Sequence, residues 1–481
     1  MQKFIFDINK NKAVLISDYL DNVREHFSAE DKTASIIRFK TGNKFIPTRK
    51  YVITKTGTFN IGLFFEIHKY IKSLQIPTEV ILTEKFKKKL LPALNIKDYK
   101  KLNLDLKDHQ IEAVNQCFKQ GRGTVVVATG GGKTLICATL IETLLEHFGA
   151  GSKIVLIVPG IQLIDQTYKE FINYGIDKNT ISMFSGDNKL DLNSRIIIAG
   201  SNILLSKKQN IDWLYDVDAI LIDEVHKVRA SNEINKVLSK IKTDHKFGFT
   251  GTMPEDIIDQ WNIIGQIGPI LTKVSSHTLR EENLLTQAKI KILKLHHKNN
   301  PKYDFKKSKE DLTINWETEN DFIYNSEWRN DIIKSLCGKI NNNILILVDR
   351  ISHGEILYNK ISTLGNKQVF FIRGEVEVED REKVREIMEI SNNIVCIAIS
   401  NIFSTGINIK NLPYIIFALA GKAKVKIIQA IGRGLRLHEN KERLIIFDIV
   451  DNFIYSTRHL QNRKVLYNNE KIPYVETTIN E

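Results

Sequence analysis

From residue 123 onward, short uninterrupted apolar segments alternate with amphipathic stretches of helix length. The first five apolar segments are residues 124–129, 153–159, 195–200, 219–224 and 246–252. Five more follow at residues 344–349, 368–374, 393–400, 414–421 and 443–450. Strands that are apolar on both faces and separated by helices are typical of a parallel sheet covered on both sides. The pattern therefore predicts two successive α/β lobes with parallel sheets, without a short-period repeat.

The first 100 residues fit neither series and predict a small α+β domain. Residues 35–45 and 49–57 read as strands, and residues 64–74 as a helix. A polar segment at 296–321 is predicted to be an insertion or linker. We expect four parts: a basic module (1–100), a first lobe (101–285), a second lobe (286–470) and a C-terminal tail (471–481).

Composition narrows the class of protein. With 42% hydrophobic and 26% charged residues, the 481-residue chain is typical of a soluble globular protein. No segment resembles a signal peptide or a membrane span, so we expect a cytoplasmic protein without membrane contact. The cysteines are far apart and predict neither disulfides nor a zinc site, but buried thiols in a reducing compartment. They are Cys117, Cys137, Cys337 and Cys396.

The net charge of +13 is unevenly distributed. Residues 1–100 contain 19 Lys and Arg against 10 Asp and Glu, and so contribute +9. Such a surface suits a polyanion such as nucleic acid. A lysine-rich solvated surface explains the same composition equally well.

Two further clusters are predicted to be ordinary surface. The adjacent His296 and His297 suggest a metal site, but alternation along a strand would point them in opposite directions. Arg458, Arg463 and Lys464 are expected on a solvated helix face.

A candidate phosphate-binding loop lies at residues 125–134, VVVATGGGKT. Val127 stands where the strict G-x-x-x-x-G-K-[ST] pattern has its first glycine. The phosphates would be held by the end of the loop and the helix after it, where Gly130 and Gly132 permit close backbone approach. Lys133 would meet the β- and γ-phosphates, and Thr134 would bind Mg²⁺. The nucleotide-binding set is Thr129, Gly130, Gly131, Gly132, Lys133 and Thr134; the alternative is a chance Gly-rich turn.

The strand 219–222 leads directly into Asp223 and Glu224. Ligands of open α/β sheets bind at the carboxyl ends of the strands. Asp223 could hold Mg²⁺ there, while Glu224 orients or deprotonates the attacking water. The alternative is a helix N-cap followed by an acidic first turn.

Together, GGGKT at 130–134 and DEVH at 223–226 resemble the superfamily-two helicases of the DEAH-like type. The resemblance implies two RecA-like lobes that use ATP and Mg²⁺. It implies that Gln110, in LKDHQ at 106–110, contacts the adenine, although Lys107 and His109 depart from the usual residues. It assigns a coupling role to His226, Thr250 and Thr252. It assigns nucleic-acid contacts to Pro159, Gly160, Gln162, Ser201 and Asn202.

The second lobe continues the resemblance. Residues 404–408, STGIN, resemble motif V, with Asn408 where many relatives have Asp. The match implies that Ser404 and Thr405 contact nucleic acid and that Gly406 contacts the nucleotide. Residues 429–436, QAIGRGLR, resemble motif VI, so Gln429, Arg433 and Arg436 are expected in catalysis. Two guanidiniums at i and i+3 can neutralise charge that develops on the γ-phosphoryl group.

Residues 267–295 and 402–412 are most like the bacteriophage UvsW-type helicases. This resemblance implies a monomeric enzyme that remodels branched or forked DNA without sequence preference, in the host cytoplasm if phage-encoded. The expected reactions are fork regression, Holliday junction branch migration, and unwinding of D-loops or R-loops. An RNA helicase or a restriction-type duplex translocase is the alternative, and an ATP-gated DNA-binding switch without turnover is an alternative of another class.

The basic module contains a candidate DNA-contacting segment at residues 44–59. Basic and aromatic residues interleave there, which suits backbone contact and base stacking. We name Arg49 and Lys50 as candidate contacts. Half-buried strands with inward aromatics would show the same pattern.

Overall fold

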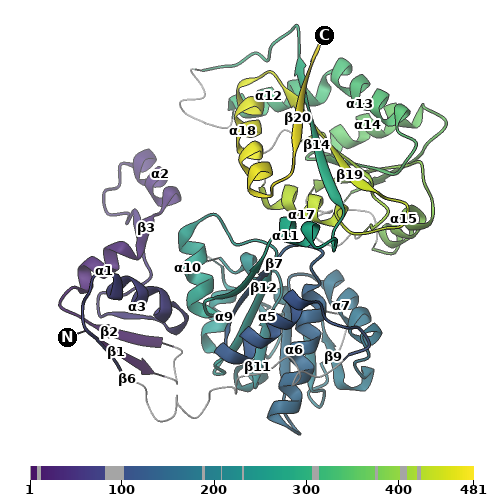
Figure 1. The fold of residues 1–481 in the computed structure, drawn as a ribbon. Helices are drawn as coiled ribbons and strands as arrows, with labels where there is room; N and C mark the ends of the chain where they lie inside the picture. The colour runs from purple at the N-terminus through teal and green to yellow at the C-terminus, as the bar shows by residue number, and fades with distance from the viewer. Residues whose placement is uncertain are drawn as a thin grey trace. The chain divides into compact units, whose positions relative to one another are not determined.

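The computed structural model describes residues 2–7, 12–81, 102–186, 190–206, 208–229, 232–305, 314–373, 378–400, 409–419 and 424–481. The chain divides into two compact units (Figure 1). One consists of Met1–Ala128 and Gly132–Val274, and the other of Thr129–Gly131 and Ser275–Glu481. The first unit holds the N-terminal module and the first lobe.

The first lobe is built on a seven-stranded sheet in which all paired strands are parallel. Its order is β13 (Ile270–Val274), β7 (Gly123–Val127), β12 (His245–Thr250), β11 (Ala219–Ile222), β8 (Ile154–Val158), β10 (Ile196–Gly200) and β9 (Ile181–Phe184). Its helices are α5 (Asp108–Gln120), α6 (Lys133–Phe148), α7 (Ile161–Asn173), α8 (Ser201–Leu204), α9 (Ile234–Lys240) and α10 (Ile257–Gln266). The five predicted strands are confirmed, and each is buried along its whole length. Helices pack on the sheet, which explains why these strands are apolar on both faces.

The second lobe repeats this architecture with another seven-stranded sheet whose paired strands are all parallel. Its order is β16 (Gln368–Ile372), β17 (Ile394–Ile399), β15 (Ile344–Val348), β18 (Tyr414–Phe417), β19 (Arg443–Asp451), β14 (Gln287–His296) and β20 (Tyr474–Asn480). Its helices include α11 (Ser276–Glu281), α12 (Ile314–Asn325), α13 (Glu327–Lys339), α14 (Ile351–Ser362), α15 (Val378–Ile390), α17 (Lys424–Gly434) and α18 (Ile454–Asn469). The predicted α/β fold of two tandem lobes with parallel sheets is therefore confirmed.

Two strands of this second sheet lie where we expected none. β14 extends to His296, into the expected linker, and β20 lies in the expected tail. The two strands pair in register from Ile290 with Tyr474 to His296 with Asn480. The chain's last residues therefore form an edge strand of the second sheet.

The N-terminal module has the predicted α+β character. Its four-stranded sheet has the order β5 (Thr58–Asn60), β2 (Lys12–Ile16), β1 (Gln2–Asp7) and β6 (Thr78–Ile81). Its helices are α1 (Leu20–His26), α2 (Lys32–Thr41), a short 3₁₀ turn η2 (Ile61–Leu63) and α3 (Phe64–Ser73). A two-stranded ribbon joins β3 (Ser28–Glu30) to β4 (Arg49–Tyr51).

The strand predicted at 35–45 is wrong, because residues 32–41 form helix α2. Asp31 Oδ1 accepts the Ala34 amide at 3.2 Å, which satisfies one of the free donors at the helix start. Gly42 follows the helix with φ at 65°. An acidic cap before the segment and a glycine after it are helix signals that the apolar run obscured.

The module packs directly on α10 of the first lobe. Its core includes Phe27 and Leu63, and the same cluster contains Ile264 of α10. The rings of Phe27 and Trp261 lie 5.5 Å apart. A Cβ at Gly62 would lie 1.9 Å from the carbonyl oxygen of Ile264, so only glycine permits this backbone approach. The module and the first lobe therefore share one apolar core.

The second lobe buries ionic clusters in place of two expected surface patches. His297 is 7% exposed, and its Nε2 lies 2.7 Å from Asp451 Oδ1. Arg329, which is fully buried, donates to the same carboxylate from Nε at 3.1 Å. Arg463, expected on a solvated face, is also buried and donates to Asp448 at 2.9 Å. Charged side chains are almost never fully buried unless they are paired, and both sites meet that condition.

The predicted burial of all four cysteine thiols is confirmed. Within the described ranges, no helix combines the length and apolar character needed to span a bilayer. No group of three or more His, Cys, Asp and Glu side chains in those ranges could hold a metal ion on its own.

Candidate functional site

The candidate phosphate-binding loop connects β7 to α6, as the sequence predicted. Gly130 and Gly132 have φ values of 88° and 80°, in the left-handed region that favours glycine. The helix begins at Lys133, so its free amides and the positive end of its dipole follow the loop. An anion suits this position.

Val127 causes no strain where the strict pattern has glycine. It is the last residue of β7, it is fully buried, and its φ is not positive. Its carbonyl oxygen accepts a hydrogen bond from Lys133 Nζ at 3.3 Å. The two glycines that need special backbone angles are therefore both present after it.

The acidic pair lies at the carboxyl end of β11. The Asp223 amide continues the sheet by donating to Ile157 O at 2.9 Å. Glu224 has φ 49° and ψ 47°, a conformation that costs a non-glycine residue about 1–3 kcal/mol. Its amide donates to Asp223 Oδ1 at 2.8 Å. Such strain persists where the surroundings enforce it, typically at functional sites.

The two carboxyls of this pair titrate differently. Burial, together with the charge of Glu224, raises the pKa of Asp223 to about 6. Burial also raises the pKa of Glu224, but the hydrogen bond from His226 and the charge of Lys133 outweigh it, and the pKa falls to about 2. A cation bound nearby would favour the ionised form of Asp223 and lower its pKa again.

His226 connects the acidic pair to β12. It lies in the 3₁₀ turn η5 (Val225–Lys227) and is buried. Its Nδ1 is 3.1 Å from Glu224 Oε2 and 2.9 Å from Thr250 Oγ1. Thr250 Oγ1 in turn donates to Thr252 O at 2.8 Å. The structure thus brings together the three residues that the sequence suggested for coupling.

Gln110 lies beside the candidate phosphate-binding loop, although it is 22 residues before Gly132 in the chain. Its side chain is buried, and its Oε1 accepts the Lys107 amide at 2.9 Å at the start of α5. A Cβ at Gly132 would lie 2.1 Å from Gln110 Nε2. The predicted adenine contact is therefore held next to the loop's last glycine.

Two predicted nucleic-acid loops lie side by side at the carboxyl ends of β8 and β10. These strands are neighbours, with Val158 opposite Gly200. Ser201 Oγ donates to Pro159 O at 3.5 Å. Asn202 is exposed at the start of α8, and Gly160 precedes α7, which contains Gln162.

In the second lobe, Gln429 and Arg433 lie on α17, and Arg436 lies two residues beyond its last residue, Gly434. The Arg436 amide still donates to Arg433 O at 3.3 Å, so the helical spacing of the two arginines is kept. Ser404, Thr405 and Gly406 lie outside the described residues.

Arg49 and Lys50 lie on β4 of the module and are about half exposed. Arg49 Nε is 3.3 Å from Glu25 Oε2, and Lys50 Nζ is 2.6 Å from Asp31 Oδ2. Exposed ion pairs contribute about 0–1 kcal/mol, so neither prevents an exchange for phosphate.

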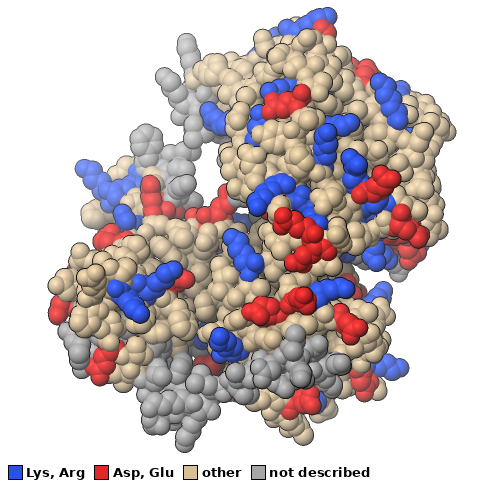
Figure 2. Space-filling view, viewed as in Figure 1, with Lys and Arg blue, Asp and Glu red and all other residues tan. Residues whose placement is uncertain are grey.

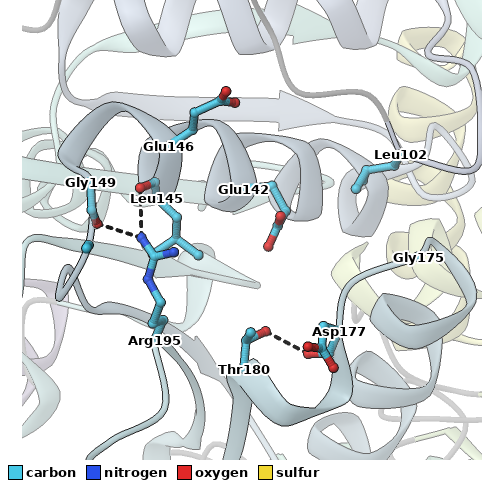
Figure 3. Close-up of a pocket in the computed structure, with 10 residues that line it drawn as sticks. Leu102, Glu142, Leu145, Glu146, Gly149, Gly175, Asp177, Thr180 and Arg195 are labelled. Atoms are coloured by element: carbon cyan, nitrogen blue, oxygen red, sulfur yellow. Dashed lines mark hydrogen bonds between the residues drawn. The ribbon is translucent and has the colours of Figure 1, made fainter.

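The first lobe contains a cavity of about 490 Å³ (Figure 3). Its lining residues include none from the candidate phosphate-binding loop. Glu142 and Glu146 of α6 line it together with Asp177. Glu146 is in the last turn of α6, whereas Lys133 is in the first, a separation of about 20 Å along the helix. Arg195 in this cavity caps α6 through the Leu145 and Gly149 carbonyls, at 2.8 and 2.7 Å. Acidic walls far from the helix start do not fit a triphosphate.

No sequence motif marks Asn262, which ties α10 to the segment after His226. Its Nδ2 donates to Val228 O at 3.1 Å and to Asn235 Oδ1 at 2.9 Å. The helix that carries the N-terminal module is thereby anchored next to the acidic pair.

Two protein-family models match the chain. The model of the type III restriction enzyme res subunit matches residues 103–255, and that of the helicase conserved C-terminal domain matches residues 328–438. They cover the two lobes in the order that the motifs predicted.

Several known proteins are similar over most of the chain. The ATP-dependent DNA helicase uvsW of Enterobacteria phage T4 is 26% identical over 399 residues, which cover 77% of this chain and 77% of the phage protein. The DNA 3'-5' translocase XPB2 of Sulfurisphaera tokodaii is 22% identical over 416 residues, 79% of this chain and 88% of the translocase. Among solved structures, S. cerevisiae Dbp5 bound to RNA and ADP BeF3 has a TM-score of 0.55 at 15% identity, covering 77% of this chain and 90% of Dbp5. The two matched domains, in this order and on this fold, show that the chain belongs to the superfamily-two helicases, and it is therefore an ATP-hydrolysing enzyme.

Proposed function

We propose that this protein is an ATP-driven DNA motor that remodels branched DNA. The reactions are fork regression, branch migration of four-way junctions, and unwinding of D-loops or R-loops. The proposal depends most on one observation. A single imidazole nitrogen of His226 contacts both the Glu224 carboxylate and the Thr250 hydroxyl. A site that only clamped ATP would have little use for a carboxylate linked to a second strand in this way.

The nucleotide is bound by the first lobe. The loop glycines and the first amides of α6 bind the phosphates, Lys133 neutralises the β- and γ-phosphates, and Gln110 contacts the adenine. Asp223 and Thr134 supply oxygen donors, which fit Mg²⁺ because this ion usually takes its remaining ligands from phosphates and water. Mg²⁺ would neutralise charge on the phosphoryl oxygens.

Hydrolysis uses the acidic pair. Glu224, with its lowered pKa, is ionised at neutral pH and can orient a water molecule and accept its proton. The water oxygen bonds to the γ-phosphorus as the bond to the β-phosphate oxygen breaks, which leaves ADP and inorganic phosphate. Arg433 and Arg436 neutralise the charge that spreads over the γ-phosphoryl oxygens, and Gln429 helps to position them.

The movement of the protein along DNA follows from the contact of Arg433 and Arg436 with the γ-phosphoryl group. Motif VI in the second lobe responds to ATP and not to ADP, so the two lobes alternate between states that grip and release a DNA strand. In the first lobe the strand would pass over the loops that contain Gly160 and Ser201. The contacts are to phosphate and sugar, which makes the motor insensitive to sequence.

Two relatives support DNA as the track, since the phage protein is named a DNA helicase and the archaeal protein a DNA translocase. The test compares ATP hydrolysis with forked DNA, four-way junctions, linear duplex and single-stranded RNA. Branched DNA is expected to stimulate most. Strongest stimulation by RNA would support an RNA helicase, and equal stimulation by linear duplex would support a restriction-type translocase.

The variant Lys133→Ala distinguishes the residues needed for ATP hydrolysis from those needed for DNA binding. We expect loss of ATP hydrolysis and of fork unwinding, with binding to DNA at low salt retained. If wild type itself binds DNA in an ATP-dependent manner but never turns over ATP, the protein is a switch and the proposal is wrong.

A further inference from the structure

Phe45 is the most exposed large apolar side chain among the described residues, at 94%. It lies in the loop that joins α2 to β4. A phenylalanine ring buries about 150 Å² or more when it is covered, so full exposure is unfavourable unless a partner covers it. Phe59, in the same candidate DNA-contacting segment (44–59), is 2% exposed and belongs to the core. The alternative that the aromatic side chains of this segment point inward is therefore correct for Phe59 and wrong for Phe45.

The loop around Phe45 is fastened at both ends. On one side Thr41 Oγ1 donates to Ile37 O at 2.8 Å, and the Phe45 amide donates to Asn43 Oδ1 at 3.0 Å. On the other side Thr48 O accepts the Asp31 amide at 2.8 Å. The backbone that carries the ring is thus held by defined hydrogen bonds, so little backbone entropy is lost when a ligand stacks on the ring.

The surroundings of Phe45 suit a polyanion. Residues 32–65 contain seven Lys and Arg and no Asp or Glu. In Figure 2, blue side chains lie at the end of the module where Figure 1 places α2 and β3, with red side chains beside them. Arg49 and Lys50 are paired there with Glu25 and Asp31, and Lys44 lies next to Phe45 in the chain. An exposed aromatic ring beside lysines is the combination that binds single-stranded nucleic acid, because the bases stack and the phosphates meet the charges.

The module also has the rigid attachment that such a ring needs. Gly62 and Phe27 contact α10, so the module shares a core with the first lobe. The module that carries the ring is therefore fixed to the first lobe by apolar packing.

We propose that Phe45 stacks on an unpaired base at the branch point of DNA, with Lys44 binding the adjacent phosphate. This inference rests on the proposed function, and it names the part of the module that distinguishes a fork from a linear duplex. The ring would hold one separated strand while the lobes advance.

The test uses the full chain and a synthetic fork that carries 2-aminopurine as its first unpaired base, without ATP. We expect wild type to quench the probe by stacking and Phe45→Ala not to do so. Phe45→Ala should weaken fork binding by roughly 5- to 150-fold, which corresponds to the free energy of stacking one base, and leave linear duplex binding unchanged. Phe45→Trp should restore both. Phe65→Ala is the matched control, since Phe65 is 52% exposed on α3 of the same module and should not matter.

Salt dependence separates stacking from charge. Phe45→Ala should lower fork affinity at every salt concentration without changing the slope of log K against log salt, whereas Lys44→Gln should reduce that slope by about one. Equal quenching and affinity for Phe45→Ala and wild type would overturn the inference, as would a self-associating wild type whose dimer Phe45→Ala dissolves. Because this assay contains no ATP, failure of ATP turnover would count against the proposed function alone.

Discussion

Nδ1 of His226 lies 2.9 Å from Thr250 Oγ1 and 3.1 Å from Glu224 Oε2. One imidazole nitrogen therefore contacts both the acidic pair and the strand that leads through Thr252 toward α10. Because residues that act as a unit give non-additive effects, this contact can be measured as a coupling.

We expect His226→Ala and Thr250→Val each to reduce DNA-stimulated ATP hydrolysis by about tenfold, with little change in KM for ATP. The double variant should be no slower than the worse single variant, which corresponds to a coupling energy on the order of 1 kcal/mol. Steady-state kinetics with saturating forked DNA measure it. Multiplied effects in the double variant would mean that the two side chains act independently.

Gly62→Ala should loosen the N-terminal module. The new Cβ would lie 1.9 Å from Ile264 O, so one backbone must shift, at a cost of about 1–3 kcal/mol or more. Limited proteolysis should cleave between the module and the first lobe earlier than in wild type. Gly186→Ala is the control, because among the described residues no atom beyond its own chain neighbours lies within 4 Å of its Cβ position. Equal resistance of both variants would show that the close approach does not hold the module.

Asp451→Asn should destabilise the second lobe by about 3–5 kcal/mol, because it leaves the buried Arg329 guanidinium without its counter-charge. Urea unfolding measures the loss. Asp321→Asn removes an exposed partner of Arg350 and should cost under about 1 kcal/mol. Similar losses for the two variants would contradict the importance of burial here.

The buried amine of Lys246 should make the stability of the first lobe depend on pH. Its side chain is fully buried, and Nζ donates to Leu238 O and Ile241 O at 3.1 and 3.0 Å. Burial, and to a lesser degree the charge of Arg122, lowers its pKa to about 7 from 10.5. The unfolded chain therefore binds more protons between these values, so the free energy of unfolding rises with pH across this window.

The expected slope is on the order of 1.4 kcal/mol for each pH unit. Chemical unfolding of wild type and Lys246→Met between pH 7 and 10 measures it, with the difference between the two proteins isolating this group. A difference that does not change with pH would show that the amine is not deprotonated in the folded state.

Much of the fold could be predicted because burial on both faces leaves a simple signal. β7, β8 and β11 are continuous apolar runs, and the sequence correctly predicts each of them as a strand. β14 differs from the apolar runs because its burial alternates, and β20 differs from them because most of its residues are exposed. α2 was misread because a short apolar run suits either element.

The positions of the candidate nucleotide-site residues in the fold could be predicted because these residues are close in sequence to the ends of those strands. Asp223, His226 and Thr250 come together because parallel strands place their carboxyl ends at one edge. The pairing of His297 with Asp451 could not be predicted, since it depends on which side chains meet in the folded core across residues far apart in sequence.

The most direct test of the account is fork unwinding by wild type and Glu224→Gln, measured beside ATP hydrolysis. Glu224→Gln keeps the size of the side chain and removes the group that accepts the proton from water. We predict that wild type separates forks in an ATP-dependent reaction, while Glu224→Gln still binds a fluorescent ATP analogue but hydrolyses ATP at least about 100-fold more slowly and unwinds nothing. Turnover by Glu224→Gln at the wild-type rate, or failure of wild type to hydrolyse ATP with any nucleic acid, would contradict the account.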